Sequence, residues 1–315
     1  MENIELKLKI ENDKYILEEA TSSNIGSIYP ITSLLWCGDT LFCKNVIIAN
    51  SNNFGKMLFT DGELQSTSND EKIYHEYLIH PSLCIYYSLY DKYSLNILVL
   101  GGGEGATTRE LLKYPKEIIN KIIWIDIDKN LIDLSRLYLK YCEEDVYKND
   151  RVFLSCEDAN DFLKDSKDKF DIIICDLPDP CIINNNINEN NEDEDGLYSK
   201  TFWNNLKKLT KEEHIIVTHL GPISPGEKNF ELCKSVLNQI NLNKINYKFG
   251  KVFISSFMSE WLYLYFSFNK SLENIKLNTN NLPSKLSVID KENINYFFYF
   301  PKYYKFNIIN NNNNK

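Results

Sequence analysis

The sequence lacks the long apolar runs and the excess of basic residues that mark several large classes of protein. No apolar run reaches the roughly 18–20 residues that a membrane-spanning helix needs. Residues 1–19 alternate charged with apolar side chains, which is unlike a signal peptide. Lys and Arg number 35 against 44 Asp and Glu, a net charge of −9, whereas phosphate binding needs clustered cations. We therefore expect neither a membrane anchor nor a nucleic-acid partner.

The cysteines form no pattern of a metal site or a disulfide framework. There are eight, with no CxxC spacing and no His at ligand spacing, at positions 37, 43, 84, 142, 156, 175, 181 and 233. Scattered thiols of this kind are typical of a reduced, intracellular protein. We expect a cytoplasmic location and no bound metal.

The chain of 315 residues has material for a large core. Hydrophobic residues make up 43% and aromatic residues 13% of it, which suits one large domain or a large and a small one. Two Asn-rich stretches contain almost no core-forming residues, 183–195 and 310–315. This composition predicts a disordered insertion and a disordered tail.

The first 66 residues are predicted to form a small antiparallel β domain. Short β-type runs alternate there with turn residues, the runs being 5–10, 31–37, 45–49 and 56–60. From Ser68 the pattern becomes helical, and Pro81 is expected to kink or split that helix.

Residues 67–300 are predicted to form one α/β domain, followed by a tail over 301–315. Short apolar strands alternate with amphipathic helices in this part of the chain. That alternation predicts a mostly parallel, doubly wound Rossmann-like sheet of the class I methyltransferase type. The strands are expected near 96–102, 121–127, 151–155, 171–177, 214–220, 251–254 and 261–268, and the helices over 106–113, 130–141, 199–209 and 229–240.

A glycine-rich turn, LGGGEGATTRELLK, lies between a buried-type strand and a helix. Gly101 and Gly103 let the backbone turn tightly and approach a ligand at the N–H groups of the helix start. Asp126 ends the next strand about 25 residues further on, where a carboxylate can accept both hydroxyls of a ribose. Asp158 follows the third strand at the expected adenine edge. Because GxxxxGK[ST] is absent, S-adenosylmethionine or a relative suits this site better than ATP, although both carboxylates could instead be strand-end or helix-cap groups.

Three further carboxylates are expected to face the same crevice. Asp176 and Asp179 follow the strand that ends in DLPDP, and Glu104 lies within the glycine turn. Converging carboxylates can bind ammonium groups through charge-assisted hydrogen bonds. The alternative is turn and capping duty before Pro180.

Several motifs in order resemble those of the polyamine aminopropyltransferases, the spermidine and spermine synthase family. They are TDGELQSTSNDEKIYHEYLIHPSL, GGGEGATTREL, DIDKN, EDA and DLPDP, and the resemblance runs from about Phe54 to Phe268. Among the subfamilies, GGGEG, DLPDP and LYSKTF look more like thermospermine synthase than spermidine synthase. The latter usually carries Asp in the glycine turn and small hydroxyl residues in the last acidic motif.

The resemblance implies transfer of an aminopropyl group from decarboxylated S-adenosylmethionine, a co-substrate rather than a cofactor, to a polyamine such as spermidine. Methylthioadenosine is released, no metal is required, and a homodimer is implied. By this resemblance Asp176 would accept a proton from the attacking amine with the help of Tyr74, and Asp179 would hold the polyamine acceptor. His75 and Glu104 would contact the polyamine or the aminopropyl amine, and Gln65 would line the same groove. Asp126 would bind the ribose, and Asp158 with Ala159 would bind the adenine. A base is needed because an alkylamine is protonated at neutral pH and is then no nucleophile.

Three features depart from the family pattern. Lys44 stands where the family has a glutamine that contacts the nucleoside, and His219 stands where relatives commonly carry glutamine near the acceptor. The insertion 183–195 lies in the loop expected to close over the substrates. Three alternatives therefore stay open: a catalytically weak relative that regulates an active partner, a spermidine synthase using putrescine, and a methyltransferase acting on an amine.

Overall fold

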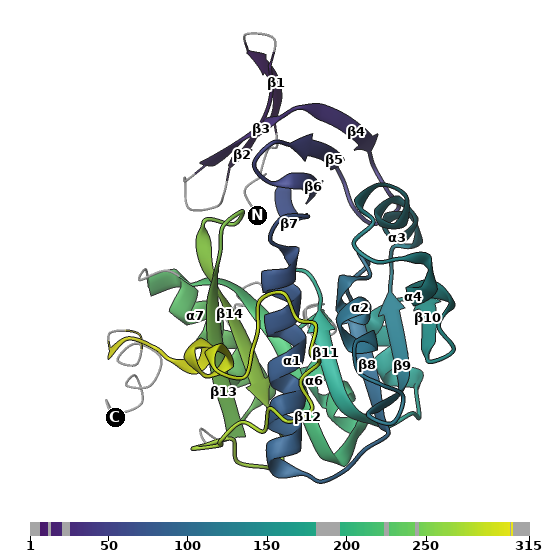
Figure 1. The fold of residues 1–315 in the computed structure, drawn as a ribbon, viewed down its shortest axis with the longest axis vertical. Helices are drawn as coiled ribbons and strands as arrows, with labels where there is room; N and C mark the ends of the chain where they lie inside the picture. The colour runs from purple at the N-terminus through teal and green to yellow at the C-terminus, as the bar shows by residue number, and fades with distance from the viewer. Residues whose placement is uncertain are drawn as a thin grey trace, which may run out of the picture.

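The structure, a computed structural model, describes residues 7–11, 14–20, 26–180, 196–223, 227–242, 246–302 and 304. Within this part of the chain the strands form three sheets of three, four and seven strands. Figure 1 shows the two smaller sheets arching over one end of the large sheet. The predicted insertion at 183–195 and most of the predicted tail at 301–315 lie outside the described residues. The predicted domain boundaries near 66 and 300 stay predictions.

The N-terminal region is antiparallel throughout, as the sequence predicted. The first sheet has the order β1-β2-β3 and the second the order β4-β5-β6-β7. The strands are β1 (Lys7–Glu11), β2 (Lys14–Ala20), β3 (Gly26–Ile31), β4 (Ser33–Gly38), β5 (Val46–Ser51), β6 (Gly55–Thr60) and β7 (Glu63–Thr67). The sequence prediction missed β2, most of β3 and β7. Leu17 and Phe59 are buried in the small core that joins the two N-terminal sheets, and Val46 and Leu58 pack against Ala106 of the α/β domain in another.

The seven-stranded sheet confirms the predicted Rossmann-like fold. Its order is β10-β9-β8-β11-β12-β14-β13, with β14 antiparallel to both of its neighbours and all other pairs parallel. The strands are β8 (Leu95–Gly101), β9 (Ile119–Asp126), β10 (Val152–Cys156), β11 (Phe170–Asp176), β12 (Thr210–Ile223), β13 (Tyr247–Ile254) and β14 (Ser259–Phe266). The carboxyl ends of β8, β9, β10 and β11 therefore meet at one edge of the sheet.

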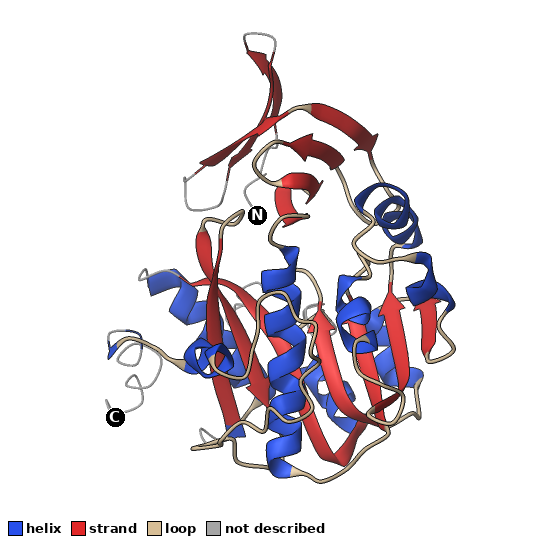
Figure 2. Ribbon diagram, in the orientation of Figure 1, coloured by secondary structure: helices blue, strands red, loops and turns tan. Residues whose placement is uncertain are grey.

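Helices cover both faces of this sheet (Figure 2). They are α1 (Glu71–Leu89), α2 (Ala106–Leu112), α3 (Lys129–Leu134), α4 (Glu144–Lys148), α5 (Ala159–Asp165), α6 (Lys200–Lys208) and α7 (Glu227–Ile240). Residues of α1 and α2 pack into one core and residues of α5, α6 and α7 into another. The helix predicted over 130–141 is instead α3 followed by a π-helical turn at Ser135–Leu139.

Pro81 does not split the first helix, because β14 compensates for the hydrogen bond that proline removes. Helix α1 continues from Glu71 to Leu89 with Pro81 inside it. Pro81 has no N–H to donate to the carbonyl of Tyr77, four residues earlier. The hydroxyl of Tyr265 on β14 donates to that carbonyl instead. The expectation of a split ignored this tertiary contact.

The chain after β14 returns along α1 and is fastened to it. Glu76, fully buried, accepts hydrogen bonds from three backbone N–H groups, those of Ser287 (2.6 Å), Val288 (2.9 Å) and Ile289 (2.9 Å). A short 3₁₀ helix (Asn293–Phe298) follows, and Phe297 stacks on Tyr77 with ring centroids 4.5 Å apart. Figure 1 shows this last segment, in yellow, beside α1.

Two kinds of feature are absent from the described residues. No helix there is long and apolar enough to cross a membrane. No group of three or more His, Cys, Asp or Glu side chains is placed there to hold a metal ion.

Candidate active site

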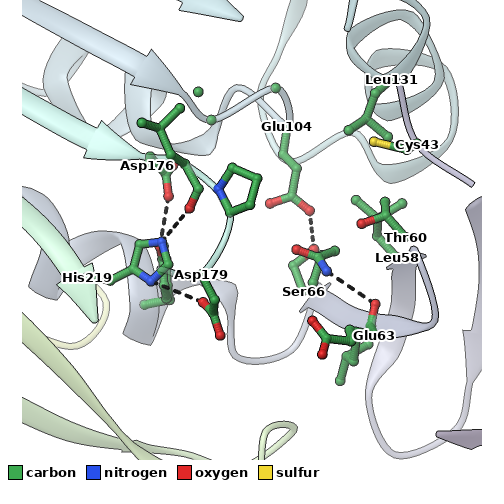
Figure 3. A pocket seen from close by; sticks show the side chains of 18 of the residues that line it. Cys43, Leu58, Thr60, Glu63, Ser66, Glu104, Leu131, Asp176, Asp179 and His219 are labelled. Atoms are coloured by element: carbon green, nitrogen blue, oxygen red, sulfur yellow. Dashed lines mark hydrogen bonds and ion pairs between the residues drawn. The ribbon is translucent and has the colours of Figure 1, made fainter. Parts of the chain in front are cut away.

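One cavity of about 580 Å³ lies between the N-terminal strands and the carboxyl edge of the large sheet. All of the predicted site residues line it: Gln65, Tyr74, His75, Gly101, Gly103, Glu104, Asp126, Asp158, Ala159, Asp176 and Asp179. They come from strand ends, from the first turns of helices and from β7, so residues far apart in the sequence meet here. Figure 3 shows several of them around the cavity.

Asp176, the last residue of β11, is held by two hydroxyl groups. Tyr74 on α1 donates to Oδ1 at 2.8 Å, and Thr107 on α2 donates to Oδ2 at 2.5 Å. Burial and the charge of Asp176 hold the pKa of Tyr74 well above its usual range, so its hydroxyl stays a donor. Two donors fix the carboxylate in one orientation at the floor of the cavity. The sequence did not single out Thr107, although it opens the helix that follows the glycine turn.

The glycine turn packs directly against the backbone of Asp176, and this contact requires Gly101. Gly101 has a φ of +81°, and a Cβ built there would lie 2.0 Å from the carbonyl oxygen of Asp176. The same carbonyl accepts a hydrogen bond of 2.9 Å from the N–H of Gly102. The turn is therefore locked to the end of β11, which places Glu104 and Asp176 in one cavity.

Glu104 and His75 form a second polar group, supported by Ser66 and Glu71, which also line the cavity. Ser66 on β7 donates to Glu104, and His75 Nε2 lies 4.0 Å from Glu104 Oε2. Burial raises the pKa of Glu104 to about 7. Burial opposes the charge on His75, but its contact with Glu71 (Nδ1 to Oε2, 3.0 Å) outweighs that and raises its pKa. The sequence analysis missed the supporting roles of Ser66 and Glu71.

The other end of the cavity carries Asp126 and Asp158. Asp126 ends β9 and accepts a 2.9 Å hydrogen bond from the N–H of Asp128. Burial raises the pKa of Asp126 to about 6. Asp158 caps α5 by accepting from the N–H of Asn160 at 2.7 Å, so it is a helix cap and a cavity-lining residue at once. Asp126 has carboxylate oxygens in reach of the cavity, as a ribose site needs.

His219 and Asp179 meet on the side of the cavity away from Asp126. Their closest atoms, Nδ1 and Oδ1, lie 3.4 Å apart. The His219 ring, on β12, packs against the Tyr74 ring with centroids 5.7 Å apart and is stacked on Trp261 at 6.1 Å. Trp261, another lining residue, was not singled out from the sequence.

Lys44 is not part of the cavity, which resolves one of the departures from the family pattern. Its ammonium pairs with Asp39 at 3.2 Å, and 67% of its side chain is exposed. Cys43, the preceding residue, lines the cavity in its place. Because its side chain points to the surface, a lysine at position 44 is compatible with a sulfonium donor in the cavity.

The fold and the carboxylate-lined cavity are those of a transferase built on a Rossmann-like sheet. The chain belongs to the spermine/spermidine synthase family, whose domain matches residues 71–278. The polyamine aminopropyltransferase of Saccharolobus solfataricus is 35% identical over 222 residues, which is 70% of this chain and 68% of the relative. Thermospermine synthase ACAULIS5 of Arabidopsis thaliana is 31% identical over 261 residues, 80% of this chain and 69% of the relative. The chain is an aminopropyltransferase, an enzyme of polyamine biosynthesis.

Solved structures agree with this assignment at the level of the fold. Spermidine synthase from Thermotoga maritima superposes with a TM-score of 0.77 at 21% identity, covering 96% of both chains. A spermidine synthase in complex with a transition state analogue, AdoDATO, gives the same TM-score and identity over 98% of this chain and 99% of the other.

Proposed function

We propose that this chain transfers the aminopropyl group of decarboxylated S-adenosylmethionine to spermidine, forming thermospermine or spermine. The observation that carries the proposal is the Tyr74–Asp176–Thr107 arrangement, which holds a carboxylate at the junction of the two ends of the cavity. One end offers Asp126 and Asp158, and the other offers Glu104, His75 and Asp179. This distribution suits a nucleoside donor facing a cationic amine.

The donor would lie along the glycine turn. Asp126 would accept the ribose hydroxyls, and Asp158 with Ala159 would face the adenine. Glu104, supported by Ser66, would pair with the ammonium of the aminopropyl arm. Because the buried Glu104 has a pKa of about 7, the incoming cation would shift it towards the ionised form.

The acceptor would lie beside Tyr74, with the attacking amine at Asp176. Asp176 would take the proton that an alkylamine carries at neutral pH, leaving a lone pair on nitrogen. That nitrogen attacks the aminopropyl carbon next to sulfur. The C–N bond forms, the C–S bond breaks, and its electron pair stays on sulfur, which leaves as the thioether methylthioadenosine. The sulfonium is already a good leaving group, so holding the two substrates in line supplies the remaining catalysis.

Two observations support spermidine as the acceptor. Thermospermine synthase ACAULIS5 aligns with 80% of this chain, and Glu104 stands in the glycine turn where spermidine synthases usually carry Asp. Transfer to putrescine is the second candidate, because the structural neighbours are spermidine synthases.

We also propose a cytoplasmic location and a homodimer. All of the described cysteines are unpaired thiols, as a reducing compartment would maintain. The homodimer is what the resemblance to the aminopropyltransferase family implies. Analytical ultracentrifugation of the purified protein tests the homodimer, and a single boundary at the mass of the monomer would contradict it.

The reaction is tested by mass spectrometry of the polyamines that the purified protein forms. Decarboxylated S-adenosylmethionine is supplied with putrescine and spermidine in separate tubes. We expect a tetraamine from spermidine, which chromatography assigns as thermospermine or spermine, together with methylthioadenosine. Spermidine formed from putrescine would favour the second candidate. Absence of product and methylthioadenosine from both tubes would contradict catalysis by this chain alone.

A further inference from the structure

His219 has one ring nitrogen that is committed to the protein and one that faces the cavity. Its Nε2 lies 2.6 Å from the carbonyl oxygen of Leu177. A carbonyl oxygen can only accept, so Nε2 carries the hydrogen and Nδ1 is the acceptor of the neutral ring. The side chain is 5% exposed, and Nδ1 has no hydrogen-bond partner in the described part of the chain. A buried acceptor without a partner is costly unless a ligand supplies a donor.

Another acceptor, the carboxylate of Asp179, faces Nδ1. The separation of 3.4 Å is longer than the roughly 2.7–2.9 Å of a charge-assisted hydrogen bond. Two acceptors facing one another can share a group that donates twice, once Asp179 has moved outwards to make room for it. Figure 3 shows the two side chains converging in this way. Asp179 remains 41% exposed, so it can move outwards while His219 is held by Leu177.

Largely apolar side chains around Trp261, which stacks on His219 and contacts Phe257, also line the cavity. Pro222 on β12, Ile254 at the end of β13, and Phe257 and Trp261 towards β14 all line it there. The reacting end lies on the other side, where Tyr74 contacts both His219 and Asp176. The chain of a polyamine acceptor could therefore extend on both sides of a nitrogen placed at His219. A nitrogen bonded to two alkyl chains is a secondary amine.

We propose that His219 Nδ1 and the Asp179 carboxylate together bind the internal, secondary ammonium of a triamine acceptor. A secondary ammonium has two N–H donors, and the pair offers one acceptor to each. Its two alkyl arms would run towards Tyr74 on one side and over Trp261 on the other. Donors at the tetrahedral angle with bonds of about 2.8 Å would place the acceptors about 4.6 Å apart. The exposed Asp179 would reach this by moving outwards about 1 Å. The proposal deepens the proposed function and rests on it, since it explains how spermidine would be preferred to a diamine.

The experiment compares spermidine with 1,8-diaminooctane, which replaces the internal N–H by a methylene group and keeps both terminal amines. In the unaltered protein we expect the KM for 1,8-diaminooctane to exceed that for spermidine by about ten- to hundredfold, from the loss of charge-assisted hydrogen bonds. In His219→Phe we expect the KM for spermidine to rise and this difference to shrink. Phe retains the ring stacking on Trp261 and lacks both nitrogens. His219→Gln, whose amide oxygen can accept, should recover part of the preference.

His214→Phe is the matched control. His214 is buried on the same strand but does not line the cavity, so this variant should keep the discrimination between the two amines. A uniform rise of both KM values in His219→Phe, or an unchanged preference for spermidine, would overturn the subsite. So would equal KM values for the two amines in the unaltered protein.

Calorimetric titration of both amines in the presence of methylthioadenosine separates this proposal from the proposed function. If neither the unaltered protein nor any variant converts spermidine, the proposed transferase activity towards spermidine is wrong. Tighter binding of spermidine than of 1,8-diaminooctane that is lost in His219→Phe would still support the subsite. If spermidine is consumed but its binding is independent of His219, the activity stands and the subsite is wrong.

Discussion

The two ends of the cavity are built in different ways. At the nucleoside end, Asp126 and Asp158 are oriented by backbone N–H groups a few residues away in the chain. At the amine end, side chains hold one another across the fold: Thr107 and Tyr74 hold Asp176, and Ser66 holds Glu104. The first end is a local product of strand–turn–helix units, whereas the second exists only when α1, α2, β7 and β11 have packed. Substitutions at the amine end should therefore lower kcat, and substitutions at the nucleoside end should raise the KM for the donor.

The largest effect is expected from Asp176→Asn. The amide removes the proton acceptor but can still receive a hydrogen bond from Tyr74. Loss of general-base catalysis should lower kcat by about 10²–10⁴-fold, with little change in the melting temperature. Release of methylthioadenosine measures the rate. A kcat close to that of the unaltered enzyme would remove Asp176 from the proton-transfer role.

A smaller effect, on binding rather than on rate, is expected from Asp126→Asn. The variant loses the charged partner of the ribose hydroxyls, so the KM for the decarboxylated donor should rise by about ten- to hundredfold. The kcat at saturating donor should change far less than in Asp176→Asn. Initial rates over a range of donor concentrations separate the two constants. A loss of kcat in Asp126→Asn as large as that in Asp176→Asn would mean that the two ends of the cavity do not act separately.

The pH dependence of stability should distinguish Glu104 from ordinary surface carboxylates. Its pKa is about 7 in the folded chain against 4.5 for an unperturbed carboxyl. A raised folded-state pKa contributes stability that is complete below the unfolded value and is lost as pH rises through the folded value. The ligand-free protein should therefore melt about 3–6 °C lower at pH 8 than at pH 5 from this group alone.

Glu104→Gln supplies the control for that shift. The neutral amide cannot titrate, so the loss of stability between pH 5 and pH 8 should be smaller in this variant. Part of the loss should remain, since Asp126 has a pKa of about 6 and acts in the same direction. Differential scanning calorimetry at both pH values measures it. Parallel curves for the two proteins would show that Glu104 does not titrate in this range.

The smallest effect is expected from Lys44→Gln. The ion pair of Lys44 with Asp39 is exposed, and such pairs contribute about 0–1 kcal/mol to stability. Because the side chain points away from the cavity, donor KM and kcat should be those of the unaltered enzyme. A marked fall in donor KM would mean that the cation reaches the sulfonium after all.

The same contrast explains what the sequence could predict. The strand ends at Gly101 and Asp126 follow from apolar runs that stop at a glycine or a carboxylate, so the sheet edge was predictable from spacing. The roles of Ser66 and Thr107 were not predictable, because tertiary packing alone decides which carboxylate each hydroxyl group contacts. The split that Pro81 allowed for does not occur, and the hydroxyl that serves the freed carbonyl comes from Tyr265, 184 residues further on.

Lys44 shows the limit of aligning a motif by counting residues. Position 44 matched a family glutamine by its distance from Phe54, yet residues 43–45 lie in a bend that precedes β5. In this bend Cys43 lines the cavity and the adjacent Lys44 is exposed, so an alignment displaced by one residue selects the wrong side chain.

The hydrogen bonds of Glu76 constrain the order in which parts of the active site can form while the chain is being translated. It directly follows Tyr74 and His75 on α1, and three of its hydrogen-bond donors belong to residues 287–289. Those donors leave the ribosome after every strand of the large sheet has been made. A nascent chain can therefore assemble its nucleoside end early, but the helix turn that presents Tyr74 gains its last support only when translation has passed residue 289.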